Sequence, residues 1–300
     1  MTASAWRTAT GVVRAPWRIA AFLLAFAVAG IGATILAQFA TMTPVAEWAR
    51  LSRVPLDQIT TVGALLVATW LTGRIVHGES WQTWSVVGLS RDAWSLRQAL
   101  VAFGAGSGVV LVPAALLLGT GFAHFAPSTA SESPWFLAWS AVALLAPAAF
   151  GEELMFRGYV FSAATDAMGR RGAVAATSIA FGLAHLWNPG PTVASIFGVA
   201  VAGVFLACVR LATGSLVAAT AAHFAVNAAQ AGILHTDVSG LALQQAGYRF
   251  VPTGPDWLTG GAWGPEAGIG VVAAMALASF LYVRRRKETA AVALPTEPNP

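Results

Sequence analysis

The sequence has few charged residues for its length. Asp, Glu, Lys and Arg make up 10% of its 300 residues, whereas hydrophobic residues make up 57%. Globular chains carry about 25% charged residues, and a soluble protein of this length has a large surface to cover with polar groups. The shortage of charge excludes a soluble enzyme and indicates an integral membrane protein, with the lipid bilayer as its surroundings.

Cysteine is almost absent, and the excess of positive charge is small. Cys208 is the single cysteine, which excludes an intramolecular disulfide and a metal site built from several cysteines. The formal net charge of +4 is too small and too scattered for a nucleic-acid-binding protein. We therefore expect no nucleic-acid partner.

Long apolar runs recur between the sparse charges. Crossing the hydrocarbon layer takes about 20 apolar residues, so we predict an all-α fold, a polytopic membrane helix bundle of about eight transmembrane helices. The sequence shows no internal repeat of the transporter kind. Gly104 and Gly108 form a GxxxG pattern that predicts close helix packing in the third run. The runs are residues 19–40, 58–77, 97–122, 135–160, 172–188, 192–210, 214–234 and 266–283.

The placement of arginine predicts how the bundle is oriented. Three arginines precede the first run, which is longer than the roughly 7–15 apolar residues of a signal peptide and is interpreted as a retained helix. Basic residues gather in alternate connecting segments, as the positive-inside rule describes, so both termini are expected in the cytoplasm. Inside lie Arg7, Arg14, Arg18, Arg91, Arg97, Arg170, Arg171, Arg210 and residues 284–287; outside lie Arg50, Arg53 and Arg249.

The runs divide the chain into four parts. The one long outer loop is rich in Gly, Pro and Trp, and Trp is common at membrane interfaces. We interpret it as an interfacial loop, with a lid or substrate-recruiting role as the alternative. The parts are 1–134 with membrane helices 1–3, 135–234 as the helical core, 235–265 as the outer loop, and 266–300 with the last membrane helix and a cytoplasmic tail.

Ionisable side chains occur within the fourth, fifth and seventh runs. Such a residue is unfavourable in lipid and is a functional candidate by default. Three pairs at i,i+4 spacing project from one helix face each, while Glu152 is rotated by about 100° from its neighbour Glu153. The pairs are Glu153 with Arg157, Phe181 with His185, and His223 with Asn227.

These side chains can perform hydrolysis if the three helices face one another. A carboxylate such as Glu152 can take a proton from water, with His185 orienting that water. Donors from His223 and Asn227 can stabilise an oxyanion. A metal version stays open, because Glu152, His185 and His223 form a ligand set for a divalent ion such as Zn²⁺. The structural alternative is that the same groups only hold helices together.

Three short motifs in this region resemble those of one family. Residues 152–157 (Glu-Glu-Leu-Met-Phe-Arg) resemble the EExxxR motif of the CPBP family, which comprises the CAAX prenyl proteases type II and bacteriocin-processing enzymes and is also called the Abi family. Residues 181–185 are similar to its FxxxH motif, and residues 223–227 to its HxxxN motif. The three motifs occur in the order of the family, and the resemblance covers about residues 135–234.

The resemblance implies an intramembrane glutamate-dependent endopeptidase, of a type often described as a metalloprotease. It makes Glu152 the base that activates water, assisted by His185, and assigns the oxyanion site to His223 and Asn227. Glu153, Arg157 and Phe181 would support the geometry. The implied partner is a peptide or protein substrate, lipidated or membrane-bound, and the implied location is a cell membrane, the inner membrane of a bacterium.

Two other functions compete with this one. A non-catalytic membrane scaffold or bacteriocin self-immunity protein would bind a peptide in the same cavity. A proton-coupled transporter would use Glu152 and the histidines as a relay, but the absence of a repeat disfavours it. Other intramembrane proteases fit poorly, because the sequence has no HExxH, GxGD or GxSG motif.

Overall fold

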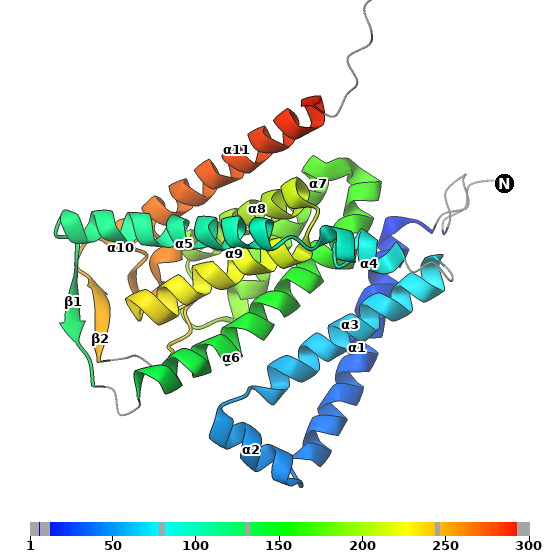
Figure 1. The fold of residues 1–300 in the computed structure, drawn as a ribbon, viewed down its shortest axis with the longest axis horizontal. Helices are drawn as coiled ribbons and strands as arrows, with labels where there is room; N and C mark the ends of the chain where they lie inside the picture. Colours follow the sequence, from blue (N-terminus) through cyan, green and yellow to red (C-terminus); the bar gives the residue numbers. More distant parts are fainter. Residues whose placement is uncertain (1–5, 7–12, 78–81, 130–132, 244–246, 293–300) are drawn as a thin grey trace, which may run out of the picture.

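The computed structural model describes residues 6, 13–77, 82–129, 133–243 and 247–292, and helices dominate this part of the chain (Figure 1). The predicted polytopic helix bundle is confirmed. Arg7, parts of two predicted outer loops and residues 293–300 of the predicted tail lie outside the described residues. The long helices are α1 (Ala15–Ala40), α3 (Leu56–His77), α5 (Leu96–Gly119), α6 (Pro134–Glu153), α7 (Val160–Ala184), α8 (Val193–Thr213), α9 (Leu216–Ala228) and α11 (Ile269–Val292).

Shorter elements connect the long helices. Two π-helical segments, η2 (Leu154–Tyr159) and η4 (Ala229–Leu234), continue α6 and α9. The 3-10 turns are η1 (Arg91–Ala93), η3 (His185–Trp187), η5 (Gly261–Trp263) and η6 (Pro265–Ala267). The remaining elements are α2 (Pro44–Ser52), α4 (Gln82–Val86), α10 (Asp256–Thr259), β1 (Ala123–Pro127) and β2 (Tyr248–Pro252).

Six helical segments of the described residues are long and apolar enough to cross a membrane. One of them, Trp135–Trp187, covers two of the predicted runs except for residue 188, and the chain turns between these two runs at Gly169 within α7. The eighth run lies in α11 and is not among the six; the apolar part of this helix ends at Val283, before Arg284. The number of crossings and the side of the termini stay predictions.

Local sequence explains where these helices begin and turn. Ser95, Ser133 and Ser215 cap α5, α6 and α9 by accepting a hydrogen bond from a backbone N–H of the first turn, which satisfies a donor that the helix leaves unpaired. Thr192 and Ser195 form a capping box at the start of α8. Gly169 has φ +71°, a conformation that glycine adopts readily, and it separates two straight parts of α7.

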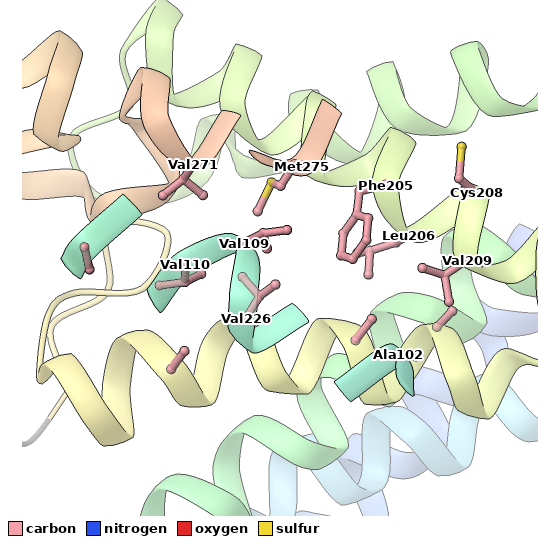
Figure 2. Close-up of a cluster of buried hydrophobic side chains, with 14 of the residues drawn as sticks. Ala102, Val109, Val110, Phe205, Leu206, Cys208, Val209, Val226, Val271 and Met275 are labelled. Carbon is pink, nitrogen blue, oxygen red and sulfur yellow. The ribbon is translucent and has the colours of Figure 1, made fainter. Parts of the chain in front are cut away.

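The main hydrophobic core lies between α5, α8, α9 and α11 (Figure 2). α5 and α9 approach closely at Gly106, where an added Cβ would collide with the backbone oxygen of Ala222. The close packing predicted for the third run is present, but the two glycines of the GxxxG pattern do not make it, because a Cβ added at Gly104 or at Gly108 would have no neighbouring atom within 4 Å. Buried members of the core include Val109, Val110, Phe205, Leu206, Val209, Val226, Val271 and Met275.

A small sheet departs from the expected all-helical fold. β1 and β2 pair antiparallel, from Ala123 opposite Pro252 to Pro127 opposite Tyr248. They belong to two segments that both lie outside the apolar runs and were expected on the same side of the membrane. Backbone groups there need hydrogen-bond partners, and strand pairing supplies them.

The elements gather at two ends of the bundle. We call one the sheet end; it carries α2, β1, β2, α10 and the loop 188–191, and in Figure 1 β1 and β2 lie at the left. Here Trp139 Nε1 donates to Ser52 O at 2.9 Å, and Asn188 Nδ2 donates to Ser239 O at 2.9 Å. These bonds join connecting segments that the sequence placed on the outer side.

The opposite end, which we call the arginine end, is joined in the same way. Arg18 contacts Asp166 at 2.6 Å, linking α1 to α7. Arg210 Nη2 donates to Val86 O at 3.0 Å, linking α8 to α4. All of these residues come from segments expected on the inner side, so the contacts at both ends agree with the predicted order of crossings.

Candidate active site

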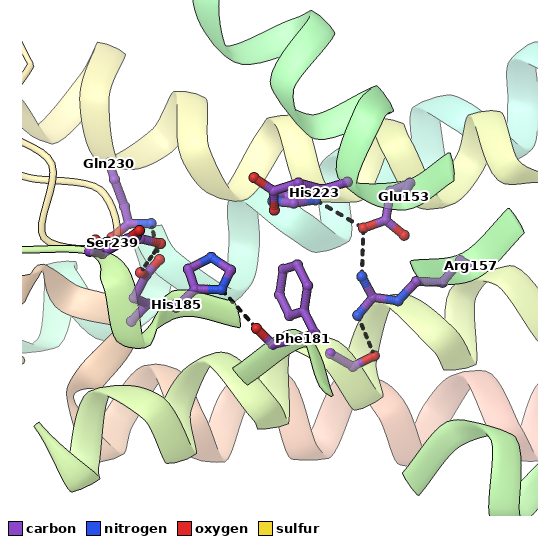
Figure 3. A network of polar contacts seen from close by, with 11 residues as sticks. Glu153, Arg157, Phe181, His185, His223, Gln230 and Ser239 are labelled. Atoms are coloured by element: carbon purple, nitrogen blue, oxygen red, sulfur yellow. Dashed lines mark hydrogen bonds and ion pairs between the residues drawn. The ribbon is translucent and has the colours of Figure 1, made fainter. Parts of the chain in front are cut away.

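The candidate residues come from three helical regions that face one another. Glu152 and Glu153 end α6, and Arg157 follows in η2. Phe181 lies in the last turn of α7 and His185 begins η3, where the chain approaches the sheet end, whereas on α9 His223 lies near the middle and Asn227 in the last turn. π-helical turns recur at functional sites, and here one continues α6 directly after the two glutamates. Figure 3 shows the side chains of the three regions pointing toward a common centre.

Glu153 is the buried centre of the hydrogen bonds in the site. Its Oε1 atom accepts a hydrogen bond from Arg157 Nη1 at 3.0 Å and one from His223 Nδ1 at 2.9 Å (Figure 3). The side chains of Glu153 and Arg157 are both fully buried, so the i,i+4 pair expected from the sequence is confirmed. Arg157 Nη2 also donates to Gly203 O at 3.0 Å. The neutralised pair thus ties α6 to α8 and α9.

Glu152 has a different environment from its neighbour. Its side chain is 39% exposed, and its Oε2 atom lies 3.8 Å from His223 Nε2. That separation is longer than a hydrogen bond. Glu152 also lines the site cavity, and within the described residues its buried Oε2 atom has no hydrogen-bond partner.

The two histidines hold defined ring orientations. His185 Nδ1 lies 2.8 Å from the backbone oxygen of Phe181; because a carbonyl only accepts, this nitrogen carries the proton and donates. In the neutral ring Nε2 is then an acceptor. His223 Nδ1 donates to Glu153, which directs its Nε2 toward Glu152. In each ring, one nitrogen is held by a hydrogen bond, and the other nitrogen is left for contacts in the cavity.

Phe181 is the common packing partner of these groups. The centroid of its ring lies 4.8 Å from the ring centroid of His185 and 5.9 Å from that of His223, and both pairs are edge-on. The guanidinium carbon of Arg157 lies 4.4 Å from its centroid, a distance suited to a cation–π contact. Phe181 therefore separates the two imidazoles and covers the buried ion pair.

A cavity of about 360 Å³ brings four of the candidate residues together. Glu152, His185, His223 and Asn227 all line it. Sequence reasoning missed the part of the wall that comes from α1, α3 and the outer loop, where no motif stands. Its additional lining residues include Gln58, Thr61, Leu65, Val238, Ser239, Leu241 and Leu243.

A second buried carboxylate anchors the outer loop beside this cavity. Glu266 is 4% exposed and accepts hydrogen bonds from Gln230 Nε2 at 2.7 Å, Ser239 Oγ at 2.6 Å and Trp263 Nε1 at 3.1 Å. A small cavity of about 20 Å³ has both Glu266 and the two site histidines in its wall. Sequence reasoning did not single out Glu266, because it stands at the border of an apolar run.

The candidate metal ligands do not form a closed set. Among the described residues, no group of three His, Cys, Asp or Glu side chains is placed to hold a metal ion. Glu152 and His223 approach each other, but His185 does not complete a three-ligand set with them. Because these donors do not fit a metal ion in this arrangement, we derive no step through one.

Comparison with known families gives one match. Residues 134–229 match the family described as type II CAAX prenyl endopeptidase Rce1-like. This segment is therefore similar to that family. The match covers about a third of the chain and contains every candidate residue from Glu152 to Asn227. No curated protein and no solved structure matches the chain.

The family agrees with the resemblance found in the three motifs. It supports an intramembrane protease function of the CAAX type for a multi-pass membrane protein. Helices α1, α3 and α5, the outer loop and α11 lie outside the matched residues, although α3 and the outer loop supply part of the cavity wall.

Proposed function

We propose that this protein is an intramembrane endopeptidase that hydrolyses a peptide bond with a water molecule activated by Glu152. The observation that carries the proposal is the division between two adjacent glutamates. Glu153 is buried in an ion pair with Arg157, whereas Glu152 faces the cavity together with both histidines and Asn227. One carboxylate holds the structure and the other can exchange a proton.

The reaction begins with water bound between Glu152 and the peptide carbonyl. The Glu152 carboxylate removes a proton as the water oxygen bonds to the carbonyl carbon, which gives a tetrahedral oxyanion and a protonated Glu152. The C–N bond then breaks, and the proton on Glu152 passes to the leaving nitrogen. The products are a carboxylic acid and an amine, with no covalent enzyme intermediate.

Donors on α9 stabilise the oxyanion. Asn227 lies one turn beyond His223 on the same helix, and both line the cavity. The Asn227 amide donates directly, and His223 donates from Nε2 when this atom is protonated while Nδ1 remains bonded to Glu153. Such preorganised donors contribute most when they are held rigidly, and the Glu153–Arg157 pair holds His223 in this orientation.

His185 assists at the water. Its Nδ1–H is engaged by the Phe181 carbonyl, so Nε2 can accept a hydrogen bond from the attacking water and orient it. The substrate is a peptide or protein that is membrane-bound or lipidated, and the setting is the inner membrane of a bacterium. A membrane-bound or lipidated substrate suits a cavity walled by membrane helices.

The proposal is tested with purified protein in lipid vesicles and a quenched-fluorescence peptide library. We expect cleavage by the wild type and loss of cleavage in Glu152→Ala and in Asn227→Ala, each checked for folding by its thermal unfolding temperature. Cleavage that persists in folded Glu152→Ala contradicts the mechanism. Peptide binding without cleavage by the wild type favours the alternative, a non-catalytic scaffold or self-immunity protein.

A further inference from the structure

The arginines of the molecule are distributed unevenly between the two ends of the bundle. At the arginine end, the described arginines that lie near helix termini or in connecting segments outnumber those at the sheet end. The sheet end has Arg50, Arg53 and Arg249, whereas the arginine end has Arg14, Arg18, Arg74, Arg91, Arg97, Arg170, Arg171, Arg210, Arg284 and Arg285. By the positive-inside rule the arginine end faces the cytoplasm.

The candidate active site opens toward the other end. The connecting segments that contribute to the cavity wall all belong to the sheet end: Asn188 from the loop after η3, and Ser239, Leu241 and Leu243 from the outer loop. Gln58 stands in the first turn of α3, next to the same end. In the described part of the chain, the segments 82–95, 161–171 and 211–214 contribute no lining residue.

A second pocket extends the site further in the same direction. It has a volume of about 620 Å³, lies beside the outer loop and shares Leu144 and Leu243 with the site cavity. One face of α6 runs along both, through Leu137, Ala141, Leu144, Ala148 and Glu152. From Leu137 to Glu152 the helix rises by about 22 Å.

This path matches an extended apolar peptide in length and chemistry. At about 3.3 Å per residue, a path of about 22 Å accommodates roughly six or seven extended residues. The α6 face offers small and aliphatic side chains until it reaches Glu152. Because the path is continuous with the site, its occupant is the polypeptide that is cut.

We propose that the substrate is an apolar polypeptide segment that enters from the sheet end, the face of the membrane away from the cytoplasm, and lies along α6. The substrate class is then an exported or membrane-inserted polypeptide with an apolar stretch beside the scissile bond. A tail held at the cytoplasmic face would have to pass through the arginine end. The cleavage itself rests on the proposed function, but the side of access is measurable without it.

The test uses the fact that Cys208 is the single cysteine and is buried. In a Cys208→Ala background we would introduce Leu241→Cys at the cavity wall, and Met168→Cys near the turn of α7 as the matched control. Both side chains are exposed, at 48% and 54%. Labelling with a membrane-impermeant maleimide is measured in intact cells and after permeabilisation.

We expect Leu241→Cys to be labelled in intact cells and Met168→Cys only after permeabilisation. The reverse order, or equal labelling of both in intact cells, overturns the inference. A second readout adds a quenched apolar peptide to the outside of vesicles of known sidedness. Cleavage confined to inside-out vesicles also overturns it, whereas the expected labelling with no cleavage in any orientation contradicts only the proposed function.

Discussion

Glu153 and His223 are 70 positions apart in the chain, yet their side chains are joined by a 2.9 Å hydrogen bond. The bond links the end of α6 to the middle of α9 and leaves His223 Nε2 directed at Glu152. It gives the two adjacent glutamates separate tasks, one in holding the site together and one in the chemistry.

Replacing Glu153 tests its structural task. Glu153→Gln leaves the Arg157 charge fully buried without a carboxylate, and breaking a buried pair in this way costs about 3–5 kcal/mol. We expect a clearly lower unfolding temperature in detergent and a loss of cleavage. Glu47→Gln is the control, because Glu47 pairs with Arg50 on the surface at 3.3 Å, where such pairs contribute little. Equal unfolding temperatures for both variants would contradict the assignment.

We expect Phe181 to contribute to the cleavage rate through the contacts of its aromatic ring, in addition to any contribution from its burial. Phe181→Leu removes an aromatic ring that contacts both histidines and Arg157. Aromatic contacts of this kind contribute about 0.5–1.5 kcal/mol each, so we expect cleavage to fall by about tenfold, or roughly 1.4 kcal/mol. The matched control is Phe161→Leu on the same helix, also buried but in a separate cluster. If both variants lose the same fraction of activity, Phe181 has no special role in the site.

Gly203 allows α8 to approach the ion pair. A Cβ added there would lie 2.9 Å from Ser178 Cα and 3.2 Å from Arg157 Nη2, so Gly203→Ala must displace the backbone or the guanidinium. We expect lower stability and slower cleavage. Gly108→Ala meets no atom within 4 Å and should be neutral or stabilising, since alanine in a helix is favoured over glycine by about 0.5–1 kcal/mol. Thermal unfolding of both variants decides the comparison.

Removal of metal ions is expected to leave cleavage unchanged. The donors in the described residues do not form a three-ligand set, and the proposed water activation uses Glu152 and His185 directly. The rate is measured before and after dialysis against a chelator. Loss of cleavage that returns when Zn²⁺ is added would show that Glu152, His185 and His223 rearrange to bind a metal.

The sequence predicted the elements whose signal is local. Apolar runs and i,i+4 spacing each depend on neighbouring residues, and they anticipated the helix bundle and the Glu153–Arg157 contact. The predicted number of eight crossings stays a prediction. Two predicted runs are joined in one helical segment across the turn at Gly169, and the apolar part of α11 is short.

Features that depend on distant parts of the chain were not predictable in this way. The β1–β2 pairing, the Glu266 network and the cavity wall from α3 join segments with no shared motif. The GxxxG pattern was misleading for the same reason, since only the packed structure shows that Gly106, which lies between the two glycines of the pattern, faces α9.

The central claim is tested most directly by the cleavage rate of Glu152→Gln measured beside its unfolding temperature. Glu152 is 39% exposed and lies outside the buried ion pair, so we expect the unfolding temperature to stay near that of the wild type. Loss of the general base is expected to lower the rate by about 10²–10⁴-fold. A folded Glu152→Gln protein that cleaves within about twofold of the wild-type rate, far less than loss of a general base gives, would contradict the claim.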